Sequence, residues 1–100
     1  MSDVDKSFTL RGDEVFDRYV DATPYLLDGQ YVESVSVEHT PPDGDPETFT
    51  QTLSPSTNAT GAWVRSTSPF SSAGWHLVDV VLSLTGSIPK VFRYRVYWAG

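Results

Sequence analysis

The sequence contains no cysteine in its 100 residues. This absence excludes disulfide bonds, zinc sites built on thiolates and cysteine nucleophiles, so an apolar core has to hold the single domain that a chain of this length forms. Histidine is also rare, since only His39 and His76 are present. A catalytic or metal-binding pair would need a third ligand or a nucleophile within reach. We therefore expect both rings to pack beneath a sheet, and we expect no cofactor, no bound metal and no enzyme activity.

Positive charge is scarce, because seven Lys and Arg face thirteen Asp and Glu and the net charge is −6. The resulting negative potential disfavours nucleic acid and anionic membranes as partners. No apolar run is long enough to cross a bilayer, and the start Met1-Ser2-Asp3 lacks the pattern of a signal peptide, so we expect synthesis in a cytoplasm. The cations Lys90, Arg93 and Arg95 form a basic stripe, whereas carboxylates are frequent from Asp3 to Asp28. Such a chain can meet a copy of itself.

Helical periodicity is missing as well, because no apolar pattern of period 3.6 lasts longer than two turns. Residues 75–84 and 91–98 instead alternate between apolar and other side chains, and a link containing Gly86 and Pro89 joins them. This pattern predicts an antiparallel hairpin. Its inward positions are His76, Val78, Val80, Leu82, Leu84, Phe92, Tyr94, Val96 and Trp98.

Four further segments have the alternation or the β-rich composition of strands, at residues 14–21, 31–39, 48–53 and 61–67. In residues 31–39 we place Val35 and Val37 on the inner face and Val32 on the outer one. A short edge strand at residues 7–10 is a further option. The turn-rich stretches between these segments favour a β-sandwich of six to seven strands over a small barrel. We assign residues 1–12 to an N-terminal arm and residues 13–100 to the sandwich domain.

The loop at residues 40–46 contains three prolines and is followed by Glu47. Asp43, Asp45 and Glu47 stand at alternate positions, as in loops that bind calcium, but the remaining spacing of an EF-hand is absent and Pro46 interrupts the pattern. A solvated acidic loop is the favoured interpretation.

Thirteen aromatic residues exceed what one thin core can hide. An exposed Trp or Tyr beside Arg93 and Arg95 is typical of a protein interface. The three tryptophans are the candidates, namely Trp63, Trp75 and Trp98, although a core position for all three is the alternative. Sequence alone does not select among them.

Several motifs resemble a group of small tailed-phage virion proteins that are described as fiber-tail adaptor or neck and tail proteins. The first is Asp21-Ala22-Thr23-Pro24-Tyr25-Leu26-Leu27-Asp28-Gly29, followed by the strand Val32-Glu33-Ser34-Val35-Ser36-Val37. The second is Ala73-Gly74-Trp75-His76-Leu77-Val78, and the third runs from Thr85-Gly86-Ser87 into Phe92-Arg93-Tyr94-Arg95-Val96. The chain differs from the group at Ser71-Ser72, where a double glycine is usual, and in its longer Pro-rich loop.

This resemblance implies an immunoglobulin-like antiparallel β-sandwich without enzyme activity. It further implies a structural virion protein present in many copies, an adaptor or head-tail connector in the neck or tail that contacts other virion proteins and copies of itself. A capsid cement or decoration protein is the near alternative, a carbohydrate- or receptor-binding module that stacks its ligand on an exposed Trp is the second, and a small hydrolase is the weakest. The candidate interface residues are Phe8, Leu10, Pro41, Pro42, Arg93, Arg95 and Trp98.

Overall fold

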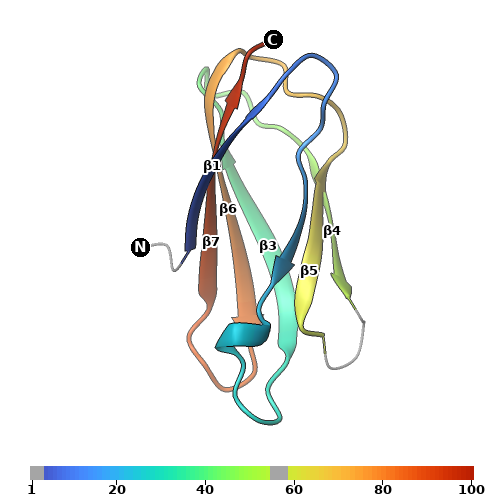
Figure 1. The fold of residues 1–100 in the computed structure, drawn as a ribbon, viewed down its shortest axis with the longest axis vertical. Coiled ribbons are helices and arrows are strands. Elements are labelled where there is room, and N and C mark those ends of the chain that lie inside the picture. Colours follow the sequence, from blue (N-terminus) through green and yellow to red (C-terminus); the bar gives the residue numbers. More distant parts are fainter. Residues whose placement is uncertain (1–3, 55–58) are drawn as a thin grey trace.

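The computed structural model describes residues 4–54 and 59–100, which fold into a sandwich of two β-sheets (Figure 1). The larger sheet has four strands, in the order β1 (Val4–Leu10), β7 (Lys90–Trp98), β6 (Gly74–Leu84) and β3 (Val32–Thr40). The smaller sheet has three strands, in the order β2 (Asp17–Asp21), β5 (Gly61–Ser66) and β4 (Phe49–Ser54). The predicted all-β sandwich is therefore confirmed, with seven strands.

Helical structure in the described part of the chain is limited to one 3-10 turn, η1 (Thr23–Tyr25), which Pro24 helps to start. The turn places the ring of Tyr25 edge-to-face against Phe92, with 5.7 Å between the ring centres. Within residues 4–54 and 59–100, no helix has the length and apolar character needed to cross a membrane.

The hairpin of β6 and β7 forms the centre of the larger sheet. Its strands pair antiparallel from Gly74 opposite Trp98 to Leu82 opposite Lys90, as the alternating pattern predicted. Successive side chains of a strand point to opposite faces, so every second residue of the hairpin faces the smaller sheet. These inward residues are buried, namely His76, Val78, Val80, Leu82, Leu84, Phe92, Tyr94 and Val96. The remaining side chains of the hairpin form the outer surface of the sandwich.

One part of the expected topology is wrong, because the sheets are not antiparallel throughout. Strand β1 lies parallel to β7, with residues 4–10 opposite residues 92–98. Residues 4–10 of the predicted arm are thus an edge strand of the sandwich, and residues 1–3 lie outside the described residues. The pairing places Phe8 beside Val96 and Leu10 beside Trp98, where both side chains pack on the core. Burial of these apolar side chains is the physical reason for the docking of the segment.

The position of Val32 also differs from the expectation, because a bulge interrupts the predicted alternation of inward and outward residues. The register between β3 and β6 shifts between Val32 and Ser34. A bulge adds one residue to one strand and thereby changes which face the following residues occupy. As a result Val32, which we placed on the outer face, is buried together with the inward residues.

Strand β2 starts three residues later than predicted, at Asp17 instead of Glu14. The preceding residue, Phe16, is nevertheless completely buried. Its backbone N–H donates to the Ser66 hydroxyl at 3.0 Å, and the Ser66 N–H donates to the Phe16 carbonyl at 2.8 Å. These two bonds hold Phe16 between the sheets without a regular strand.

We expect the core to respond strongly to loss of volume at Leu82, whose side chain is fully buried. Leu82→Ala should lower the free energy of unfolding by about 2–5 kcal/mol, because the truncated side chain leaves a cavity. The matched control Leu27→Ala changes a leucine that is 71% exposed, and it should change the free energy of unfolding by less than about 0.5 kcal/mol. Urea unfolding followed by tryptophan fluorescence measures both, and equal losses would contradict the inward placement of Leu82.

Candidate interaction surface

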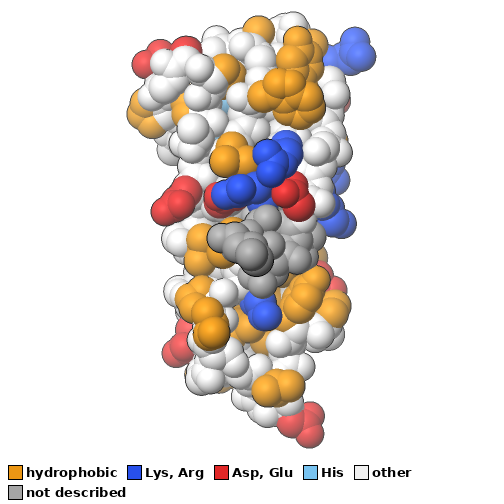
Figure 2. Space-filling view, turned by 90° about the vertical axis from the view of Figure 1, so that its left-hand side faces the viewer, with side chains coloured by type: hydrophobic (Ala, Val, Ile, Leu, Met, Phe, Trp, Pro, Cys, Tyr) orange, Lys and Arg blue, Asp and Glu red, His pale blue; other side chains and the backbone are white. Residues whose placement is uncertain are grey.

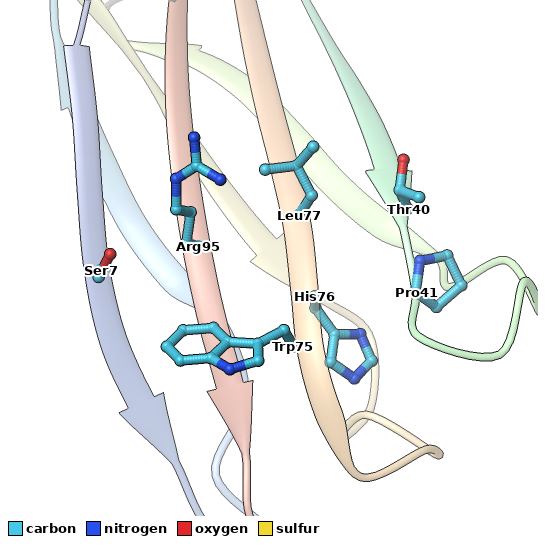
Figure 3. A pocket seen from close by; sticks show the side chains of 7 residues that line it. All are labelled: Ser7, Thr40, Pro41, Trp75, His76, Leu77 and Arg95. Atoms are coloured by element: carbon cyan, nitrogen blue, oxygen red, sulfur yellow. The ribbon is translucent and has the colours of Figure 1, made fainter.

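The outer face of the larger sheet contains a hollow of about 410 Å³ (Figure 3). Its floor is a row of cross-strand neighbours that crosses β1, β7, β6 and β3, namely Ser7, Arg95, Leu77 and Thr40. Trp75 and Pro41 form the walls, and the edge of His76 borders the hollow as well. The hollow is therefore assembled from four strands that are distant in the sequence.

Trp75 is the largest apolar group on this face, with 59% of its surface exposed. Its indole extends over β7 (Figure 3) and meets the ring of Tyr97, which is 38% exposed, in an edge-to-face contact with 5.3 Å between ring centres. The two residues are cross-strand partners at outward positions of β6 and β7. An aromatic pair held on a rigid sheet is a common anchor of protein interfaces.

The two arginines of the predicted basic stripe are neutralised by aspartates of the same face. Arg93 donates two hydrogen bonds of 2.8 Å to the carboxylate of Asp79, and Arg95 donates two of 3.1 Å to the carboxylate of Asp5. The hydrogen bonds and the charge of Asp79 raise the pKa of the Arg93 guanidinium. Basic and acidic side chains also lie together near the middle of the face in Figure 2, between groups of hydrophobic side chains. The two arginines of the stripe thus form ion pairs and are not a free positive patch.

The two histidines lie beneath this face, as expected, and are hydrogen-bonded to each other. His76 Nε2 is 2.7 Å from the Ser72 carbonyl oxygen, which can only accept, so this nitrogen carries the proton. His76 Nδ1 then accepts from His39 Nε2 at 2.9 Å. The ring of Phe70 stacks on His76, with 4.1 Å between centres.

The second nitrogen of His39, Nδ1, is buried and has no partner among the described residues. A proton placed there would be poorly solvated. Burial and, to a smaller extent, the nearby His76 lower the pKa of His39 to about 4, although the charge of Glu47 opposes both effects. His39 is therefore neutral near pH 7.

The acidic loop beside the hollow is organised by its own hydrogen bonds. The carboxylate of Asp43 accepts from the backbone N–H of Asp45 at 2.9 Å, and Glu47 accepts from the N–H and the hydroxyl of Ser71. The side chains of Asp43 and Asp45 are exposed. Residues 4–54 and 59–100 contain no group of three or more side chains arranged to hold a metal ion.

The structure separates the predicted interface residues into two groups. Leu10 and Pro41 are buried, Phe8 is half-buried against the core, and the half-buried Trp98 donates its indole N–H to the Gly12 carbonyl at 3.1 Å. Arg93 is half-buried in its ion pair, whereas Pro42 and Arg95 are exposed. Phe8 and Leu10 thus pack on the core of the sandwich.

Sequence reasoning missed Ser7, Leu77 and Tyr97 as members of this surface. Alternation within β6 and β7 already placed Leu77 and Tyr97 at outward positions, and that signal could have identified them. Ser7 gave no such signal, because its place in the row depends on the parallel pairing of β1 with β7.

Comparison with known proteins gives no match to a family model, to a curated protein or to a solved structure.

The two ion pairs should differ in their contribution to stability. Asp79 is 9% exposed, so Arg93→Met would leave a largely buried carboxylate without its partner. Arg95→Met frees Asp5, whose side chain is 44% exposed and can be solvated by water. We expect Arg93→Met to lower the urea midpoint at least about twice as much as Arg95→Met does. Equal decreases would contradict this difference in environment.

Stability should fall on acidification because of His39. The folded ring takes up a proton only near pH 4, whereas the unfolded ring does so near its ordinary pKa of 6.5. Unfolding therefore binds a proton between these values, and the free energy of unfolding decreases as the pH falls from about 6.5 to about 4. A fully buried ring would lose about 3 kcal/mol, and we expect about 1–2 kcal/mol because His39 is half-buried.

The control for this effect is His39→Gln, which retains an N–H donor but does not titrate. Urea unfolding of both proteins at pH 7, 6 and 5 should give a smaller pH dependence for the variant. The same slope in both proteins would show that other groups cause the acid sensitivity.

Proposed function

We propose that the chain is a structural virion protein of a tailed phage, a small adaptor in the neck or tail assembly that works through protein–protein contacts in many copies. Its contact surface is the outer face of the larger sheet. The observation that carries this proposal is the hollow beside Trp75 and Tyr97, because exposed aromatic rings next to a concave apolar site are what a protein interface uses as anchors.

The neutral character of this face supports the same function. Charged groups that are paired within one protein stay paired when a second protein covers them. Covering Arg93 and Arg95 therefore leaves neither charge buried without a partner. Binding by this surface therefore relies on shape and apolar contact rather than on long-range attraction.

The topology supports the kinship that the sequence motifs suggested. The orders β2-β5-β4 and β7-β6-β3 correspond to the B-E-D and G-F-C orders of immunoglobulin-like sandwiches. Strand β1 joins the second of these sheets, beside β7. The motif residues Gly74-Trp75 begin β6 directly after Ala73, and Asp28-Gly29 forms the turn before β3, with Gly29 at a φ of 79° that favours glycine.

A capsid cement or decoration protein would use the same kind of surface at a different place in the particle. A carbohydrate-binding module is favoured by a separate observation on the smaller sheet, where Trp63 is 49% and Tyr19 37% exposed. Their ring centres are 4.8 Å apart. Gly61 leaves room for the Tyr19 ring, since a Cβ there would approach its Cζ to 2.8 Å. Exposed aromatic rings can stack on sugars, so this pair is the second candidate site.

The test compares Trp75→Ala with Trp63→Ala in the phage that encodes the chain, using the amount of each variant in purified particles as the readout. We expect Trp75→Ala to reduce incorporation by about tenfold or more, because a central aromatic anchor is lost. Trp63→Ala should be incorporated normally, and both variants should unfold at similar urea concentrations because both rings are exposed.

Two results would contradict the proposal. Absence of the wild-type chain from the particles would exclude a virion component. Normal incorporation of Trp75→Ala would exclude the hollow as the contact surface. If Trp63→Ala is incorporated but lowers adsorption of the particle to cells, the carbohydrate-binding function is supported instead.

A further inference from the structure

Two aliphatic side chains stand out at the end of the sandwich where β6 turns into β7. Ile88 is 84% and Leu27 71% exposed, the highest values among the large hydrophobic residues that the structure describes. They border one shallow depression, together with Tyr25 and Lys90. We call Leu27 and Ile88 the tip. Apolar groups this exposed contribute little to the fold and are available for contact with another molecule.

The tip is rigid, because the side chain of Gln30 joins the two loops that carry it. Its Oε1 accepts from the Leu27 backbone N–H at 2.8 Å, and its Nε2 donates to the Thr85 carbonyl at 2.7 Å. Tyr31 and Thr85 exchange two further hydrogen bonds of 3.1 Å. A contact surface that is already ordered loses little conformational entropy on binding.

The hollow beside Trp75 lies toward the other end of the molecule, whose longest dimension is 43 Å (Figures 1 and 3). Its apolar walls are Trp75, Leu77 and Pro41. A volume of about 410 Å³ corresponds to about a dozen water molecules at roughly 30 Å³ each, which is enough for an aliphatic side chain. The molecule thus has a protruding apolar group at one end and an apolar recess near the other.

The charges of the two ends favour the same arrangement. The loops at the end near the hollow contain five carboxylates and one arginine, namely Asp13, Glu14, Asp43, Asp45, Glu47 and Arg11. At the tip Asp28 and Lys90 balance each other. Contact between two acidic ends would be repulsive, whereas the tip has no net charge and can approach the exposed Asp43 and Asp45 beside Pro41 without that repulsion.

We propose that the tip of one copy docks in the hollow of the next copy, so that the chains assemble head to tail. This inference rests on the proposed multi-copy function and supplies its contact. The two surfaces are different, so the contact is heterologous and produces a ring or an open row of copies. Since a two-residue tip covers a small area, a single contact is weak, and many simultaneous contacts make the assembly stable.

The test uses a tip variant, Ile88→Asp, and a hollow variant, Leu77→Asp, with Trp63→Ala as a control on the opposite sheet. Sedimentation velocity at increasing protein concentration should show association of the wild type and of the control. Each of the two Asp variants alone should remain monomeric. A 1:1 mixture should form a heterodimer and nothing larger, because one partner retains an intact hollow and the other an intact tip.

Circular dichroism and urea unfolding establish that each variant is folded, and Trp75→Ala replaces the hollow variant if Leu77→Asp is not. The inference is overturned if the wild type stays monomeric up to about 1 mM, a concentration that detects a contact of about 4 kcal/mol. It is also overturned if Ile88→Asp associates like the wild type, or if the mixture forms no heterodimer. Normal incorporation into particles together with any of these results would leave the proposed function intact and reject only the head-to-tail contact.

Discussion

The register between neighbouring strands of the larger sheet is the constraint on which the candidate surface depends. Ser7, Arg95 and Leu77 come from three strands and meet only because β1 pairs with β7 at one particular offset. A shift of one residue in any of these strands would turn its outward side chains toward the core. The inward side chains of the half-buried Phe8 and the fully buried Val96 oppose such a shift, because it would expose them. The same apolar burial that stabilises the sandwich therefore also positions the hollow.

One face of the β6–β7 hairpin is buried in the core and the other bears ion pairs, because successive side chains of a strand point to opposite faces. Alternate positions of one strand have opposite environments, so Val78 and Val80 are fully buried between the sheets while Asp79 between them can pair with Arg93. The ion pairs remove net charge from a face that also bears Trp75. Such a surface can be covered by a partner without leaving a charge desolvated, and this property agrees with a protein that functions by contact.

Much of the fold follows from local pattern. The hairpin at residues 75–98 was predicted with its correct inner face, because every position from His76 to Leu84 obeys the period of two. The failures occurred where a non-local contact overrides the local pattern. Val32 is buried because of a bulge that the residues around it do not predict. Alternation at residues 7–10 allowed a short edge strand, but its extension to Val4 and its parallel pairing with β7 depend on the edge that β7 offers.

The sequence by itself determined the fold class, the central hairpin and the placement of both histidines beneath the sheet, since these properties depend on the spacing of apolar residues along one strand. Only the tertiary structure decided that Trp75 and not Trp98 is the exposed tryptophan of the hairpin, and that Arg93 and Arg95 have partners of their own. Those outcomes depend on which strands become neighbours and in which register. Hydrogen bonds between strands that are far apart in the chain fix that arrangement, and a local pattern carries no information about their partners.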